Sequence, residues 1–146
     1  MIIYIDSSVL ARAYLEDESG HMEAQTLLTD PERALVTGTW TKVEVSGALV
    51  RAAWAGRAGE DQLLALLDAD LADDGPVVMV AAPQEDVERL ALQLVRSHGI
   101  RAMDAWHLAT ASLILPALVE KGEELGFATR DQDQAKVALT LGFTAI

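Results

Sequence analysis

Short runs of β-branched and aromatic residues alternate along the chain with longer segments in which apolar residues recur at helical spacing. Short apolar runs bounded by turn residues predict buried strands, and apolar residues repeating every three to four positions predict amphipathic helices. We therefore expect strands at 2–5, 34–37, 77–80, 126–129 and 143–146. Helices are expected at 7–14, 20–30, 40–56, 59–73, 84–98, 103–121 and 131–142.

Strands that alternate with helices favour one fold class. A parallel strand pair needs a crossover connection, normally a helix, so the sheet becomes covered on both faces. The sequence predicts a three-layer α/β sandwich around a mostly parallel sheet of about five strands. No linker or repeat divides the chain, so we expect a single domain over 1–146. Ligands of such sheets bind beyond the carboxyl ends of the strands, at the topological switch point.

Two local features of the helices are predicted as well. Ser7 or Ser8 offers an N-cap for the first helix, because a hydroxyl there can accept a bond from a free backbone N–H. Pro116 lies inside the helix expected at 103–121 and should strain or bend it, since proline lacks the N–H and clashes with the preceding turn.

Composition narrows the class of protein. Hydrophobic residues make up 51% of the chain, which argues against disorder, and no apolar run is long enough to span a bilayer. Met1 leads directly into "IIYID" without a basic segment, so we expect no signal peptide. The chain has no cysteine, which excludes disulfides and thiolate metal sites. We expect a cytoplasmic protein with no membrane association.

The net charge of −12, from 11 basic and 23 acidic residues, opposes contact with nucleic acid. Phosphate binding depends mainly on lysine and arginine, so a nucleic-acid ligand would require metal ions, a local basic patch, or both. Otherwise the charge indicates a solvated acidic surface or a basic protein partner.

Four acids follow or flank predicted strands. Asp6 ends the first strand, Asp131 follows the fourth, Glu44 lies early in the helix after the second, and Asp104 opens an apolar helix. Such acids could converge at one end of the sheet, where they would raise each other's pKa. Mg²⁺ or Mn²⁺ would relieve that repulsion, because both prefer carboxylate and water oxygens.

Each acid also has a purely structural interpretation. Asp6, Asp104 and Asp131 could each cap a helix N-terminus or meet its dipole. Glu44 could complete a capping box with Thr41, since "TKVE" fits that pattern. Taken singly, each acid favours the structural interpretation; their joint placement favours a site.

Four segments carry a resemblance to a known family: "IIYIDSSVLARAY" at 2–14, "TKVEVSGALVRA" at 41–52, "GIRAMDAWHLATA" at 99–111 and "FATRDQDQAKVALTLGF" at 127–143. Short motifs of this kind occur by chance, but all four in this order are specific. The chain resembles the PIN-domain ribonucleases over essentially its whole length, in particular the VapC-type toxins of prokaryotic toxin–antitoxin pairs.

The resemblance implies roles for the four acids. Asp6, Glu44, Asp104 and Asp131 match the family's catalytic, metal-binding quartet. Asp6 and Asp104 match direct Mg²⁺ ligands. Asp131 would complete the inner shell or act through water, and Glu44 would hold a second metal ion or orient water.

Other polar residues receive weaker assignments. Ser8 and Thr129 match hydroxyl positions that support the family's site, and Asp133 is an additional acid. His107 lies one turn from Asp104, but the family's "DAxHLA" motif indicates a histidine that hydrogen-bonds within the fold. Arg12, Arg101 and Arg130 could supply phosphate contacts. The tryptophans are expected in the core or an interface rather than stacked on bases.

The function implied by the resemblance is a Mg²⁺- or Mn²⁺-dependent endoribonuclease toxin that hydrolyses RNA phosphodiester bonds through metal-activated water. It would form a homodimer and be neutralised by a VapB-like antitoxin that crosses the toxin and directs a basic side chain into the acidic site. We expect an apolar groove for this partner, with about half of its candidate residues in the core instead. The candidates are Leu10, Tyr14, Leu27, Leu28, Leu63 and Leu66.

Two alternatives remain open from the residues. Another metal-dependent phosphoryl hydrolase would also place acids at strand ends, although the Asp-x-Asp of a phosphatase is absent after the first strand. A catalytically silent PIN-like module used for assembly is the other. Loss of metal-dependent cleavage in Asp6→Asn would separate the nuclease from the silent module.

Overall fold

A computed structural model, which describes all 146 residues, shows a five-stranded sheet with the strand order β3-β2-β1-β4-β5. Every neighbouring pair is parallel. The strands are β1 (Ile2–Ile5), β2 (Ala34–Gly38), β3 (Val77–Val80), β4 (Leu125–Ala128) and β5 (Thr144–Ala145). The predicted three-layer α/β sandwich and all five predicted strands are therefore confirmed.

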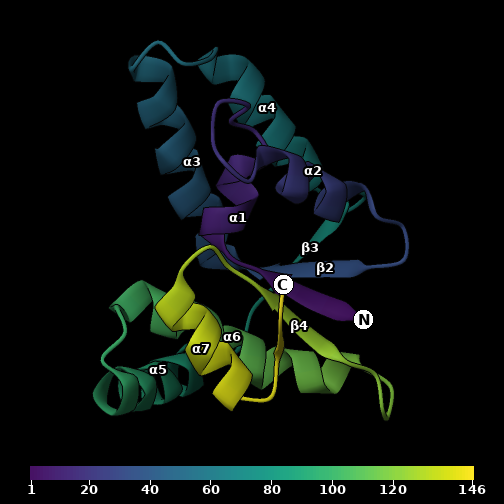
Figure 1. Cartoon of the computed structure of the whole chain (residues 1–146), viewed down its shortest axis with the longest axis vertical. Coiled ribbons are helices and arrows are strands. Elements are labelled where there is room, and N and C mark those ends of the chain that lie inside the picture. Colours follow the sequence, from purple (N-terminus) through teal and green to yellow (C-terminus); the bar gives the residue numbers. More distant parts are fainter.

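Seven helices lie on the two faces of this sheet (Figure 1). They are α1 (Ser7–Arg12), α2 (His21–Thr29), α3 (Thr39–Trp54), α4 (Glu60–Asp70), α5 (Gln84–His98), α6 (Ala102–Leu118) and α7 (Gln132–Thr140). In the view of Figure 1, α1 to α4 lie above the sheet and α5 to α7 below it. None of these helices combines the length and apolar character needed to cross a membrane.

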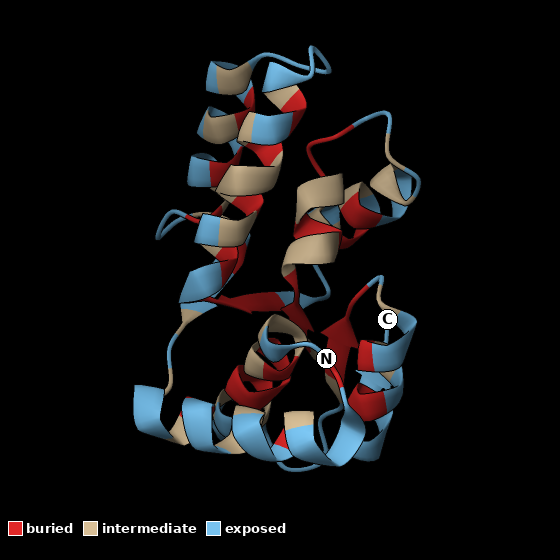
Figure 2. Ribbon diagram, turned by 90° about the vertical axis from the view of Figure 1, so that its left-hand side faces the viewer, coloured by how far each residue is buried: buried red, intermediate tan, exposed pale blue.

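The period-two geometry of β1 divides the interior into two apolar cores. Ile3 and Ile5 are fully buried among the residues of α1 to α4, whereas Tyr4 points the other way and is fully buried among α5, α6 and α7. Alternate side chains of a strand point to opposite faces, so a central strand buried on both sides needs apolar residues at every position. Figure 2 shows buried residues concentrated on the sheet and on the helix faces directed toward it.

The strand order creates one topological switch point. The chain moves from β1 to β2 and β3 on one side, and then returns to place β4 and β5 on the other. Thus β1 and β4 are neighbours, and their register pairs Ile5 with Ala128, so the two strands end level with each other. Residues that follow these strands meet at the carboxyl edge of the sheet, where open α/β sheets bind ligands.

Two local predictions need correction. The N-cap of α1 is Asp6, whose side chain accepts a bond from Val9 N–H, and not Ser7 or Ser8. Helix α6 continues through Pro116 but ends at Leu118, shorter than predicted. A carboxylate competes with a neighbouring hydroxyl for the capping position because its bond to a backbone N–H is charge-assisted.

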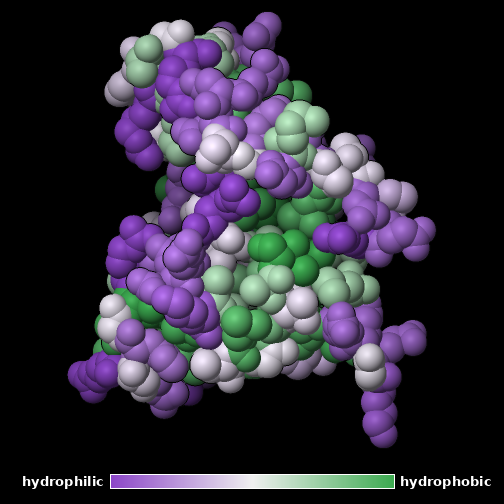
Figure 3. All heavy atoms as spheres, viewed as in Figure 1, coloured by the Kyte–Doolittle hydropathy of each residue, from purple (hydrophilic) through white to green (hydrophobic).

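The prediction of an apolar groove is wrong for most of the six residues that were expected to line it. Leu10, Tyr14, Leu27 and Leu63 are buried in the core between the sheet and α1 to α4. Leu28 packs partly against the same core, and Leu66 on α4 is 54% exposed. A groove lies nearby, between α1 and α3, but a mixture of small and charged residues lines it. Hydrophilic residues cover much of the face seen in Figure 3, apart from an apolar area near its middle.

Candidate active site

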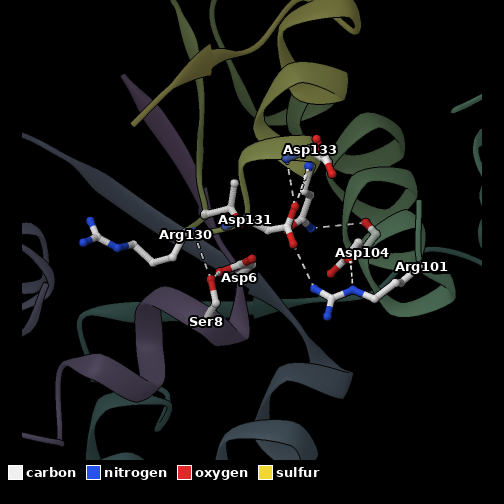
Figure 4. A network of polar contacts seen from close by, with 9 residues as sticks. Asp6, Ser8, Arg101, Asp104, Arg130, Asp131 and Asp133 are labelled. Atoms are coloured by element: carbon white, nitrogen blue, oxygen red, sulfur yellow. Dashed lines mark hydrogen bonds and ion pairs between the residues drawn. The ribbon is translucent and has the colours of Figure 1, made fainter. Parts of the chain in front are cut away.

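The four predicted acids line a single pocket of about 430 Å³ at the carboxyl edge of the sheet. Asp6 and Asp131 reach it from the ends of β1 and β4, Glu44 from α3 and Asp104 from α6. Figure 4 shows Asp6, Asp104 and Asp131 facing one another across this pocket. Four segments that are distant in sequence therefore bring their carboxylates to one place.

Asp6 is the most deeply buried of the four, with 2% of its surface exposed. Its backbone N–H donates to the Ala128 carbonyl at 3.1 Å, which ties the end of β1 to β4. Its Oδ1 accepts from Ser8 Oγ at 2.7 Å and from Val9 N–H at 3.0 Å. Burial raises the pKa of Asp6, and the hydrogen bonds from the Ser8 hydroxyl and the Val9 N–H oppose the rise by favouring the charged form.

Ser8 connects the two central strand ends. Its hydroxyl donates to Asp6 and accepts a bond from Arg130 N–H at 3.0 Å, as drawn in Figure 4. The loop after β4 is thereby fixed to the start of α1. The structure thus places Ser8 in direct support of Asp6, in keeping with the hydroxyl position that the sequence suggested.

Asp131 is both the N-cap of α7 and a member of the pocket. Its Oδ1 accepts from the N–H groups of Asp133 and Gln134, each at 2.9 Å, while its own N–H donates to Thr129 Oγ1 at 3.0 Å. The capping interpretation of Asp131 is therefore correct. Only one of its carboxylate oxygens is used in capping; the other, Oδ2, lies at the pocket, where Arg101 donates to it at 2.9 Å.

Asp104 lies in the first turn of α6, three residues after the N-cap position held by Arg101. The interpretation of Asp104 as the N-cap is therefore wrong. Its side chain, 16% exposed, is paired with Arg101 Nε at 2.7 Å, and Arg101 also reaches Asp131 at 2.9 Å. The guanidinium, 75% exposed, therefore bridges two of the four acids from the solvent side (Figure 4).

Glu44 lies one turn inside α3 and does not belong to a capping box. The helix begins at Thr39 after Gly38, and the Thr41 hydroxyl bonds to Thr37 instead. Glu44 Oε1 contacts His107 Nε2 at 2.7 Å. The structural interpretation of Glu44 through Thr41 is thus wrong, and His107 hydrogen-bonds within the fold as expected.

Three residues make contacts in this region that the sequence analysis did not predict. Tyr4 bonds to His107, Gln134 bonds to both Thr129 and the Asp104 carbonyl, and Arg101 bridges two acids. Gln134 follows the α7 N-cap by three residues, a spacing that marks the first turn of a helix. The spacing of Arg101 and its partner in α6, three residues, was a comparable signal.

Comparison with known proteins shows to which family the chain belongs. The PIN domain family model matches residues 3–139. The chain belongs to the PIN domain family. PIN domains are generally nucleases. No curated protein has significant sequence similarity to the chain.

Solved structures share this PIN fold at low sequence identity. The crystal structure of PAE2754 from Pyrobaculum aerophilum superposes with a TM-score of 0.60 at 16% identity, covering 99% of this chain and 89% of that one. A toxin–antitoxin complex from Klebsiella pneumoniae contains a chain with a TM-score of 0.55 at 20% identity, covering 92% of each. At these identities the likeness concerns the fold.

The chemistry of this PIN domain's pocket suits a hard divalent cation. All four side chains offer carboxylate oxygens, the ligands that Mg²⁺ and Mn²⁺ prefer, and nuclease members of the family typically use divalent metals. No hydrogen-bond partner is present for Asp6 Oδ2 or Glu44 Oε2. The structure contains no group of three or more such side chains already arranged to hold a metal ion. Arg101 instead neutralises part of the charge.

The raised pKa of Asp6 gives a pH prediction. The folded state holds the Asp6 proton more tightly than the unfolded state, so the stabilisation is complete below the ordinary pKa of 3.8 and is lost as pH rises through the raised value. Asparagine cannot ionise and keeps an oxygen for Val9 and Ser8. Without metal, Asp6→Asn should therefore become increasingly more stable than the wild type as pH rises from about 4 to 8.

Urea denaturation in EDTA across this range measures the effect, and Asp133→Asn is the matched control. Asp133 is 79% exposed and pairs with Lys136, so its substitution should give a small difference that does not grow in the same direction. Parallel pH profiles for Asp6→Asn and the wild type would contradict the account of Asp6.

Proposed function

We propose that this PIN domain is a Mg²⁺- or Mn²⁺-dependent endoribonuclease that acts as the toxin of a toxin–antitoxin pair. The observation that carries the proposal is the convergence of Asp6, Glu44, Asp104 and Asp131 on one pocket at the switch point of the sheet. Neither cysteine nor a strand-to-helix serine elbow is present, so a water nucleophile suits the chain better than a covalent one.

The four acids would have different roles in binding the cation and the water, according to their environments. Asp6 and Asp104 are the proposed direct ligands, with Asp131 completing the shell directly or through water. When bound, the cation supplies activated water and a counter-charge for the phosphodiester. Glu44, held by one oxygen against His107, keeps its other oxygen to hold a second cation or to orient the attacking water.

Arg101 must leave its present position for the cation to bind. It bridges Asp104 and Asp131, and its exposed guanidinium is free to turn toward solvent. An exposed ion pair contributes little stability, so the exchange for a divalent cation costs little. Once displaced, Arg101 lies at the mouth of the pocket, where it could contact a substrate phosphate despite the acidic surface.

Substitution of the acids tests the catalytic proposal. Asp6→Asn, Asp104→Asn and Asp131→Asn should each lower Mn²⁺-dependent cleavage of a labelled RNA about a hundredfold or more, because each removes a charge that acts on the transition state. Glu44→Gln should also impair cleavage. Asp133→Asn, in the first turn of the helix that Asp131 caps but highly exposed, should cleave normally.

Two outcomes would contradict the assignment. Cleavage that persists in Asp6→Asn, or that survives EDTA, would exclude this pocket as the source of activity. A folded wild-type protein that cleaves no RNA with Mg²⁺ or Mn²⁺ would favour the silent binding module.

The proposed protein partner is a VapB-like antitoxin. A groove of about 680 Å³ runs between α1 and α3, lined both by small residues such as Ala11 and Ala48 and by charged ones such as Arg12, Arg51 and Arg57. Ser7, Ser8 and Glu44 line both this groove and the acidic pocket, so a chain lying in the groove would end at the carboxylates. A basic side chain there would take the place that Arg101 now holds.

The comparison supports this partner at the level of fold, because one solved structure with the same fold is a toxin–antitoxin complex. A homodimer, an RNA substrate and a cytoplasmic location belong to the same proposal. They rest on the resemblance to VapC-type toxins.

Coexpression with the product of the adjacent gene tests the partner. It should give a stable complex that is inactive on RNA and that weakens as salt is raised, because charge complementarity contributes to it. Ala48→Trp should weaken the complex by filling the groove between α1 and α3. The same change at Ala72, an exposed residue beyond α4 that does not line the groove, is the matched control. A wild-type chain that forms no complex with this gene product would contradict the proposed partner.

A further inference from the structure

A line of buried hydrogen bonds runs from the start of α3 to the acidic pocket. Gly38 N–H donates to Tyr4 Oη at 3.0 Å, Tyr4 Oη contacts His107 Nδ1 at 2.9 Å, and His107 Nε2 contacts Glu44 Oε1 at 2.7 Å. Tyr4 and His107 are 0% and 1% exposed. The line ends on one of the four acids, while its other members lie outside the pocket.

The chemistry of the four groups gives the line a direction. An ionised Glu44 can only accept, so His107 Nε2 must carry a proton. In the neutral imidazole Nδ1 is then an acceptor, and the Tyr4 hydroxyl donates to it. Tyr4 Oη in turn accepts from the Gly38 N–H. Each group has a suitable partner in this order: Glu44 requires the proton on Nε2, and the Tyr4 hydroxyl donates to the Nδ1 that is left as an acceptor.

Packing holds the imidazole in place. The ring meets Trp106 edge to face, with centroids 5.4 Å apart, and Tyr4 stacks on Phe127 with centroids 5.3 Å apart. Position 38 allows this arrangement because it is glycine. A Cβ there would lie 2.7 Å from the Trp106 ring and 2.7 Å from Tyr4 Oη. The ring therefore has little room to turn away from Glu44.

We propose that His107 is a positioning residue that fixes the Glu44 carboxylate, with Tyr4 holding the imidazole ring through its Nδ1. One oxygen of Glu44 is engaged by His107, and the other is left without a hydrogen-bond partner beside the acidic pocket. The catalytic consequence rests on the proposed function, since a fixed Glu44 matters for cleavage only if the pocket cleaves RNA. Residues that orient a metal-site ligand in this way commonly affect activity or metal affinity about 10- to 100-fold.

Tyr4→Phe tests the proposal against a matched control within the same chain. It removes the hydroxyl that bonds to Nδ1 but leaves His107 and Glu44 in place. Tyr14→Phe removes the hydroxyl of another buried tyrosine, which donates to Asp70 at 2.8 Å in the opposite core. Nitrogen NMR of the histidine rings at neutral pH reports the tautomer, and steady-state RNA cleavage with Mn²⁺ reports kcat and KM.

The wild type should show His107 protonated at Nε2 and bare at Nδ1. Tyr4→Phe should leave Nδ1 without its hydrogen-bond donor, shift the Nδ1 signal and lower kcat about tenfold with little change in KM. Tyr14→Phe should change neither the His107 signals nor kcat. Glu44→Ala, which removes the acceptor from a half-buried position, should shift the Nε2–H signal even if Tyr4→Phe does not fold.

Two results would overturn the proposal: a wild-type His107 protonated at Nδ1 alone, or a folded Tyr4→Phe with unchanged His107 signals and kcat. If the wild type cleaves no RNA, the proposed function fails separately. The signals of the wild type and Glu44→Ala then still decide whether the imidazole holds Glu44.

Discussion

Repulsion among carboxylates gathered at one edge of a parallel sheet is the constraint on which the rest of this structure depends. The register of β1 and β4 places Asp6 at the switch point, and the loop after β4 brings Asp131 to the same edge. Burial of Asp6 makes its charge costly, as the raised pKa of this side chain reflects. The surrounding polar groups are arranged so that negative charge can remain there.

Three kinds of group supply the compensation. Backbone N–H groups at the starts of α1 and α7 donate to Asp6 and Asp131, so each acid is at once a helix cap and a member of the pocket. The Ser8 hydroxyl satisfies one oxygen of Asp6. Arg101 covers the pocket from outside with the one compensating charge that can leave without disturbing the core. Removal of an acid therefore changes both the fold's electrostatics and the site.

The sequence was sufficient to predict what depends on hydrophobic pattern and strand order. The strands, the helices and the convergence of the four acids follow from short apolar runs and from where Asp6 and Asp131 follow them. Individual contacts were less predictable. The choice of Asp6 over Ser8 as a cap depends on which side chain turns back to the Val9 N–H, and burial of Leu10 or Leu63 depends on how α1 and α4 rotate against the sheet. The bonds of His107 and Arg101 join segments whose relative placement exists only in the folded chain.

Thermal unfolding with and without Mn²⁺ tests the central claim, that the acidic pocket binds a divalent cation, most directly. A ligand bound only by the folded state at about 100 times its Kd adds about 2.7 kcal/mol, which for a chain of this size raises Tm by about 5–10 °C. Mn²⁺ should produce such a rise in the wild type and in Asp133→Asn, and a much smaller one in Asp6→Asn and Asp104→Asn. An equal rise in all four proteins would contradict the account.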